Sequence, residues 1–143
     1  MAVNAVGSGE ARWQALPVAL DAFDAIREAV TAAAEDTPRV RQALLACDEW
    51  VANVVSYSGA NSFEFCFAAE GGELVVGFAD DGEPFDPTQD RGEMADFDDL
   101  DLGGMGLILI RETAAEMAYE RRDGRNVLSL RFDLGGDGPN QNI

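Results

Sequence analysis

Two polar side chains, Glu49 and Asn53, stand four residues apart in a segment with helical spacing. That spacing places both on one face of a helix, about one turn apart. A carboxylate can accept a proton as a general base, and an amide oxygen can bind a hard cation such as Mg²⁺. Polar residues with this spacing also form the solvated face of ordinary amphipathic helices, so the pair alone favours the structural interpretation.

An acidic turn follows an expected strand at residues 80–87, with the sequence DDGEPFDP. Asp80 places a carboxylate at the end of that strand, and Gly82 allows the backbone to turn with positive φ. Asp and Gly are also common in turns that bind nothing. The segment thus offers Asp80 as a candidate ligand-binding carboxylate, with a plain polar turn as the alternative.

A glycine-rich segment, residues 102–107 (LGGMGL), precedes another expected helix. Glycines at this position allow a phosphate to approach unpaired backbone N–H groups, and the helix dipole favours its negative charge. A flexible hinge without a ligand would have the same composition. The segment is a candidate phosphate site only in combination with other evidence.

Two helices are expected before the acidic turn. The first runs from Pro17 to about Glu35. The second begins at Thr37, a good N-cap residue, followed by Pro38 at the first helical position, and ends at residues 58–59. Apolar residues recur every three or four positions along the second helix and predict one buried stripe. The stripe consists of Val40, Leu44, Cys47, Val51 and Val54.

The remaining pattern predicts strands and one more helix. Strands are expected at residues 12–16, 62–69 and 73–79, then a long loop at 80–103, a helix at 104–117, and a hairpin of strands 119–122 and 126–133. This order predicts an α+β two-layer sandwich, with a mixed, mostly antiparallel sheet and helices on one face. One domain is expected at residues 11–134, between tails at 1–10 and 135–143.

The charge balance excludes several kinds of site. The chain has 27 acidic and 10 basic residues, a net charge of −17, and its basic residues are all arginine. Without histidine or lysine it cannot form a Ser-His-Asp triad, a histidine-bound zinc, a phosphohistidine or a phosphate loop that needs lysine. Strong acidity also argues against direct nucleic-acid binding.

Cellular location is predicted from two further features. The sequence has neither an apolar run long enough to span a membrane nor an N-terminal signal core, so a cytoplasmic protein is expected. Cys47 and Cys66 lie in apolar patterns and are expected to be buried thiols in a reducing compartment, with a disulfide as the alternative.

Taken together, the three polar segments resemble the N, G1 and G2 boxes of the GHKL ATPases, the superfamily of gyrase, heat-shock chaperones and histidine kinases. The resemblance covers residues 12–134 in order and spacing. Its compact form, E-x-x-x-N at 49–53 with D-x-G-x-P-F-D-P at 80–87, looks most like the stand-alone anti-sigma-factor serine kinases. It implies the GHKL fold, with ATP and Mg²⁺ as the cofactors.

The resemblance also implies roles for the polar residues. Asn53 would bind Mg²⁺, and Glu49 would be the general base. Asp80 would accept a hydrogen bond from the adenine amino group, and Gly82 would leave room for the base. Asn126 stands where the family often has threonine near the adenine.

A phosphate cradle is implied as well, in the glycine-rich segment. It would consist of Gly103, Gly104, Met105 and Gly106, with Leu107 in the helix behind them.

Two positions depart from the family pattern. Tyr57 stands where the family often has histidine, and Leu102 where some of these kinases carry an arginine that touches the terminal phosphate. Arg91, in the loop, is a candidate substitute for that arginine. These departures make ATP binding a safer expectation than kinase activity.

The function implied is that of an ATP-dependent serine protein kinase, which acts as an anti-sigma factor and phosphorylates an antagonist protein in a partner-switching system. Its expected partners are a sigma factor and the antagonist, and a homodimer is implied too. The alternative is a catalytically weak or inactive ATP-binding module that changes protein partners with nucleotide state. The catalytic half of a histidine kinase and a sandwich without nucleotide are less favoured.

Overall fold

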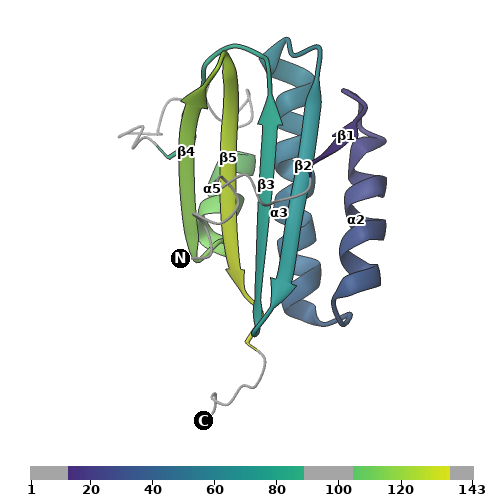
Figure 1. Ribbon diagram of the computed structural model, residues 1–143. Coiled ribbons are helices and arrows are strands. Elements are labelled where there is room, and N and C mark those ends of the chain that lie inside the picture. The colour runs from purple at the N-terminus through teal and green to yellow at the C-terminus, as the bar shows by residue number, and fades with distance from the viewer. Residues whose placement is uncertain (1–12, 89–104, 136–143) are drawn as a thin grey trace.

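The computed structural model describes residues 13–88 and 105–135 of the 143-residue chain. Their helices lie in one layer and their strands in another, as Figure 1 shows. In chain order the elements are β1 (Gln14–Leu16), α2 (Ala22–Ala33), α3 (Pro38–Asn53), the π-helix η1 (Val54–Ser58), β2 (Phe63–Glu70), β3 (Glu73–Asp80), α5 (Met105–Thr113), β4 (Glu116–Arg122) and β5 (Arg125–Asp133).

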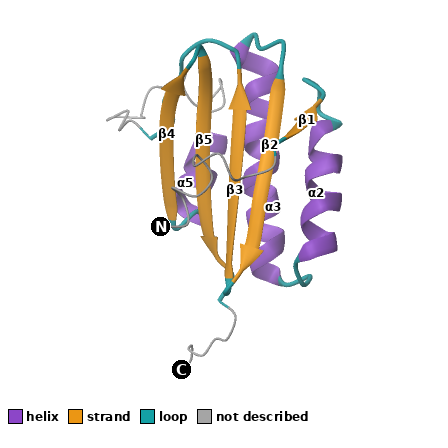
Figure 2. Cartoon of the chain, in the orientation of Figure 1, coloured by secondary structure: helices purple, strands orange, loops and turns teal. Residues whose placement is uncertain are grey.

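The described strands form one five-stranded sheet in the order β1-β2-β3-β5-β4. Every pair of neighbouring strands in this sheet is antiparallel, and a mixed but mostly antiparallel sheet was expected. The helices cover a single face of the sheet, which confirms the predicted two-layer α+β class (Figure 2). Asp80, the last residue of β3, is paired with Asn126 of β5, so this end of the sheet brings the two side chains together.

Helix α3 follows the sequence pattern closely. The Thr37 hydroxyl accepts a hydrogen bond from the backbone N–H of Val40 at 3.2 Å, which confirms the predicted N-cap. All five residues of the predicted apolar stripe are buried. The last turn widens into η1, a geometry that occurs often at functional sites.

Two predicted helix boundaries are wrong. Helix α2 begins at Ala22 rather than Pro17. Helix α5 ends at Thr113 rather than Met117, because the chain joins the sheet there: Met117 pairs with Leu130 of β5. The backbone N–H of Ala115 already donates to the carbonyl of Arg131 at 2.7 Å. Pairing with an existing strand satisfies these backbone groups and overrides the local helical pattern.

The two cysteines lie on opposite sides of the sheet. Cys47 belongs to the core between helices and sheet, together with the contacting rings of Phe63, Phe65 and Phe78. Cys66 lies on the other face, in a small cluster with Val75. Both thiols are free, so the alternative of a disulfide is wrong. Within residues 13–88 and 105–135, no helix is both long and apolar enough to cross a membrane.

Candidate functional site

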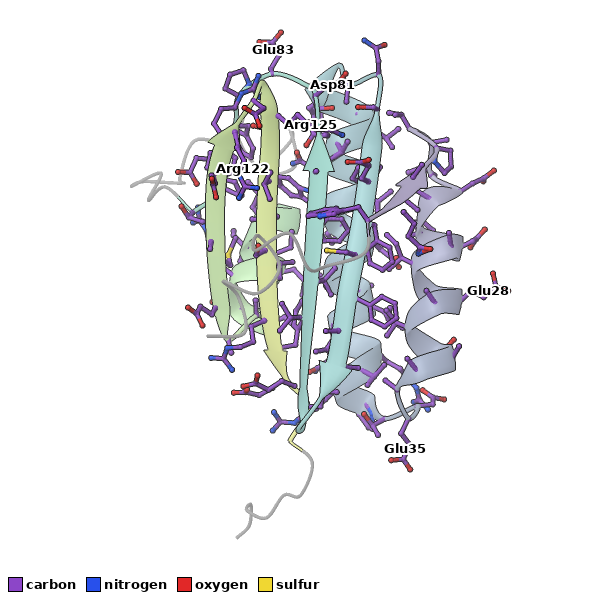
Figure 3. All side chains as sticks on the ribbon, in the orientation of Figure 1. Glu28, Glu35, Asp81, Glu83, Arg122 and Arg125 are labelled. Atoms are coloured by element: carbon purple, nitrogen blue, oxygen red, sulfur yellow. The ribbon has the colours of Figure 1, made fainter. Side chains whose placement is uncertain are left out.

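A cavity of about 190 Å³ lies at the end of the sheet where α3 and η1 meet the loop after β3. This end carries the labelled Asp81 and Glu83 at the top of Figure 3. Asn53 and Asp80, which come from two of the three segments singled out in the sequence, both line the cavity. The lining residues are Trp50, Asn53, Val54, Tyr57, Ser58, Asp80, Glu83, Pro84, Phe85 and Asn126.

Asp80 is a buried carboxylate with one oxygen already in use. Its exposed fraction is 2%. Its Oδ2 accepts hydrogen bonds from the backbone N–H of Gly82 at 2.9 Å and from Nδ2 of Asn126 at 3.1 Å. Among the described residues no group donates to Oδ1, so this oxygen is the acceptor available to a ligand.

The neighbouring carboxylates Asp80 and Asp81 have opposite electrostatic environments. Burial raises the pKa of Asp80 above the ordinary 3.8, although the hydrogen bonds from Gly82 and Asn126 work in the other direction. Asp81 is exposed, and the backbone N–H groups of Ser62 and Asn61 lower its pKa below 3.8. Asp81 accepts hydrogen bonds from the backbone just before β2, whereas Asp80 lines the cavity.

Asn126 holds the loop after β3 in place. Its Nδ2 donates to Asp80 and to the carbonyl of Glu83, at 3.1 and 2.8 Å. Its Oδ1 accepts a hydrogen bond from the backbone N–H of Phe85 at 3.3 Å. The amide therefore binds both the carboxylate and the backbone that follows it.

Sequence reasoning missed two residues that fix this amide, Tyr119 and Arg121 of β4. The Tyr119 hydroxyl and NH1 of Arg121 donate to Oδ1 of Asn126, the latter at 3.1 Å. NH1 of Arg121 also donates to the carbonyl of Gly82 at 2.9 Å. The signal available in the sequence was the alternation of β4, which puts residues 119 and 121 on the same face as Asn126.

Gly82 allows the loop to touch the end of the π-helix. A Cβ built on Gly82 would lie 2.5 Å from the carbonyl oxygen of Ser58 and 2.8 Å from its Oγ. The same Ser58 carbonyl accepts a hydrogen bond from the backbone N–H of Glu83 at 2.9 Å. In this structure the space at Gly82 is thus occupied by Ser58; room for a base at Gly82 stays a prediction.

Glu49 lies against the first turn of α5. A Cβ on Gly106 would lie 2.5 Å from Oε1 of Glu49. The absence of a side chain at Gly106 therefore lets the carboxylate reach the N-terminal turn of α5. The structure thus places the predicted general base beside the segment predicted to bind phosphate.

An aromatic wall of the cavity also escaped prediction. The rings of Trp50 and Phe85 are stacked, with centroids 6.4 Å apart and an interplanar angle of 20°. Trp50 is 2% exposed, and within the described part of the chain its Nε1–H has no acceptor. A buried donor without a partner, on a residue that lines a cavity, fits a ligand with an acceptor atom.

The remaining predicted residues are only partly described. Met105 is the first residue of α5, and Leu107 is buried at 6% exposure in the core behind it. Gly103, Gly104, Leu102 and Arg91 lie outside the described residues. Tyr57 lines the cavity although 47% of it is exposed.

Comparison with known proteins gives three results. Residues 10–132 match the family model described as a histidine kinase-like ATPase domain. The serine/threonine-protein kinase BtrW of Bordetella bronchiseptica is 33% identical over 99 residues, which cover 64% of this chain and 70% of BtrW. The solved structure of the Acinetobacter baumannii histidine kinase AdeS is similar over 93% of this chain and 74% of that one, at 15% identity and a TM-score of 0.48.

Proposed function

Because the chain belongs to the histidine kinase-like ATPase family, we propose that it binds ATP in this cavity and transfers the terminal phosphoryl group to a serine of a protein substrate. The observation that carries the proposal is Asp80, a buried carboxylate of the cavity lining whose Oδ2 accepts two hydrogen bonds and whose Oδ1 has no donor among the described residues. A family match over most of the chain supports a kinase-like ATP-binding role.

An adenine ring fits the chemistry of the cavity. Its amino group can donate to Oδ1 of Asp80, whereas guanine presents a carbonyl at the equivalent position and would meet a second acceptor. Trp50, Val54 and Phe85 provide apolar contact for the ring. Pockets for whole drug-sized ligands measure roughly 300–1,000 Å³, so a cavity of about 190 Å³ suits a base rather than an entire nucleotide.

Asn53 would hold Mg²⁺ through its side-chain oxygen. Mg²⁺ in nucleotide sites takes few protein ligands and completes its shell with water and phosphate oxygens, which agrees with one protein ligand, the Asn53 amide in the cavity lining. When bound, the ion would supply positive charge to the phosphates. The first turn of α5, at Met105 and Gly106, would offer unpaired N–H groups to the phosphates.

Glu49 would act as the general base. The serine oxygen forms a bond to the terminal phosphorus, the bond between that phosphorus and the bridging oxygen breaks, ADP leaves, and the serine proton passes to the Glu49 carboxylate. Contact of Glu49 with Gly106 puts this carboxylate next to the proposed phosphate site.

The biological role we propose is that of an anti-sigma factor in a partner-switching system, with a sigma factor and a phosphorylated antagonist as the partners. Support comes from the compact motif at residues 49–53 and 80–87 and from similarity to a serine/threonine-protein kinase. The alternative is an ATP-binding module without efficient transfer. Tyr57 and Leu102, which depart from the family pattern, favour that alternative.

The two roles are separated by incubating the chain with radiolabelled ATP and a candidate antagonist. Serine labelling that disappears in Glu49→Ala supports the kinase, whereas tight ATP binding without transfer supports the module.

Binding itself is tested by calorimetry with Mg²⁺ and ATP. Asn53→Ala is expected to abolish the Mg²⁺-dependent part of the affinity. Gln42→Ala, which removes an exposed amide from the same helix, is the matched control and should bind like the wild type. An unchanged dissociation constant in Asn53→Ala would count against the site.

A further inference from the structure

Asn126 is the only side chain within the described residues that joins Asp80 to strand β4, and its amide can point in two directions. In the observed direction Nδ2 faces the Asp80 carboxylate. If the amide were rotated by half a turn, Oδ1 would face Oδ2 of Asp80 and two acceptors would meet. The direction of this amide thus decides whether Asp80 meets a donor or an acceptor.

Three donors hold the observed direction, because all of them bind Oδ1. One is the backbone N–H of Phe85, at 3.3 Å. The other two are the Tyr119 hydroxyl and NH1 of Arg121. A rotated amide would present its NH₂ group to these three donors and lose every one of the bonds.

We infer that Tyr119 and Arg121 are positioning residues for nucleobase selectivity: by fixing the Asn126 amide they keep Asp80 an ionised acceptor for the adenine amino group. The inference rests on the proposed function, since it presumes that Asp80 binds the base. Neither residue lines the cavity, so both act through Asn126.

The charges around Asp80 are consistent with this role. Burial, the strongest influence, and the charge of Asp81 disfavour the ionised form of Asp80, whereas the hydrogen bonds from Gly82 and Asn126 and the charge of Arg121 favour it. Rotation of the amide would remove one favourable contact and add a repulsive one. A protonated Asp80 would then become a donor, suited to a base that carries a carbonyl instead of an amino group.

ATP and inosine triphosphate test the inference, because they differ at the base position that Asp80 would bind. We expect Tyr119→Phe to reduce the preference for ATP by up to about fivefold, the equivalent of one hydrogen bond of about 1 kcal/mol. The affinity for ATP should also begin to fall at a higher pH than in the wild type. Tyr119→Phe changes neither formal charge nor cavity lining.

Arg121→Gln gives the second variant and Arg122→Gln its matched control. Both remove one positive charge from neighbouring positions of β4, but Arg122 pairs with Glu120 at 2.8 Å and makes no contact with Asn126 among the described residues. Only Arg121→Gln should lower the ATP preference. Arg122→Gln should keep the wild-type ratio.

Each outcome has a distinct meaning. A wild-type chain that binds both nucleotides equally, or neither, contradicts the proposed function itself. A wild-type preference for ATP that is unchanged in Tyr119→Phe and Arg121→Gln overturns the inference alone. So does an equal loss of affinity for both nucleotides, because that result would mean that the two residues only support the fold.

Discussion

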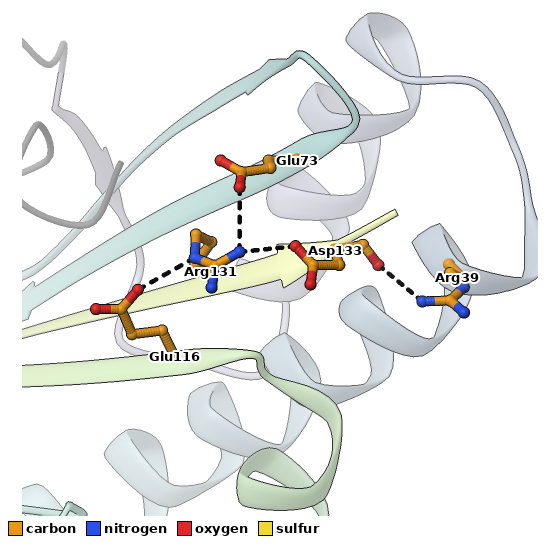
Figure 4. A network of polar contacts seen from close by, with 5 residues as sticks. All are labelled: Arg39, Glu73, Glu116, Arg131 and Asp133. Atoms are coloured by element: carbon orange, nitrogen blue, oxygen red, sulfur yellow. Dashed lines mark hydrogen bonds and ion pairs between the residues drawn. The ribbon is translucent and has the colours of Figure 1, made fainter. Parts of the chain in front are cut away.

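The two ends of β5 carry polar networks in opposite surroundings. At one end Asn126 is 3% exposed and makes five hydrogen bonds, to Asp80, Glu83, Phe85, Tyr119 and Arg121. At the other end Arg131 binds the carboxylates of Glu73, Glu116 and Asp133 at 2.7–3.1 Å, and Arg39 donates to the Asp133 carbonyl (Figure 4).

The difference between these networks is one of burial. The Arg131 side chain is 22% exposed and its carboxylate partners are 39–56% exposed, so water can replace each partner. Ion pairs of this kind contribute little to stability. Around Asn126 water has little access, and a lost partner leaves a buried polar group unsatisfied. Polar groups at the cavity end are therefore expected to affect ligand binding. Those at the other end are expected to contribute only weak surface ion pairs.

The largest expected effect is on nucleotide affinity in Asp80→Asn. Since Oδ2 already accepts two hydrogen bonds, an asparagine must keep its oxygen there and turn its NH₂ group toward the ligand, so that a donor meets the adenine amino group. A loss of about 2 kcal/mol, roughly 30-fold in the dissociation constant for ATP, is expected by calorimetry.

Asp81→Asn is the control for that variant, because it changes the same charge one residue away. Its carboxylate bonds to backbone N–H groups of Asn61 and Ser62, away from the cavity lining. ATP affinity should stay near the wild-type value. Equal losses in both variants would mean that net charge, rather than contact with the base, controls binding.

The next effect is on stability, in Gly82→Ala. The added Cβ would lie 2.5 Å from a backbone carbonyl of Ser58, which cannot move without shifting the end of η1. Overpacking of this kind costs about 1–3 kcal/mol in the free energy of unfolding, measurable with urea. Gly106→Ala is the comparison, because its Cβ meets the flexible Glu49 carboxylate and should cost less stability. A larger stability loss in Gly106→Ala would contradict this ranking.

A smaller effect is expected from pH. The neighbouring carboxylates Asp80 and Asp81 should change the stability of the folded chain in opposite directions as pH falls. Because the pKa of Asp80 is raised in the folded chain, protonation begins above the ordinary 3.8, and ATP affinity should fall on acidification through that window. In the same window Asp80 favours the folded state as pH falls, since the folded chain binds its proton more tightly.

Asp81 behaves in the reverse manner. Its lowered pKa stabilises the folded chain above pH 3.8, and that contribution is lost as pH falls through the folded pKa. Nucleotide titrations of wild type and Asp80→Asn at several pH values separate the two groups. The variant should lose most of the acid dependence; if it retains the wild-type profile, another group is responsible.

The smallest effect is expected at the other end of β5. Arg131→Gln breaks three exposed ion pairs, so its melting temperature should change less than that of Asn126→Ala, and the change should shrink further in high salt. ATP affinity should equal that of the wild type. A drop in affinity would mean that the two ends of the strand are coupled.

Local chemistry allowed much of the fold to be predicted. The Thr37 cap, the Pro38 start and the stripe of α3 depend on neighbours within a few residues, and they were right. The end of α5 was wrong because residues 114–117 fit a helix locally, while pairing with β5 made part of them a strand. Helical periodicity cannot report a hydrogen-bond partner that is distant in the chain.

At the site, the sequence by itself predicted the candidate polar groups, and only the tertiary structure decided what surrounds them. Glu49, Asn53 and Asp80 could be named as candidates because the three polar segments together resemble the boxes of a known family, although each segment alone has an ordinary structural explanation. The hydrogen bonds of Tyr119 with Asn126 and of Glu83 with Ser58 follow no motif, since they form where strand pairing and helix packing bring separate segments within hydrogen-bonding distance. Such contacts depend on the fold of the whole domain, because burial is what makes each of those hydrogen bonds necessary.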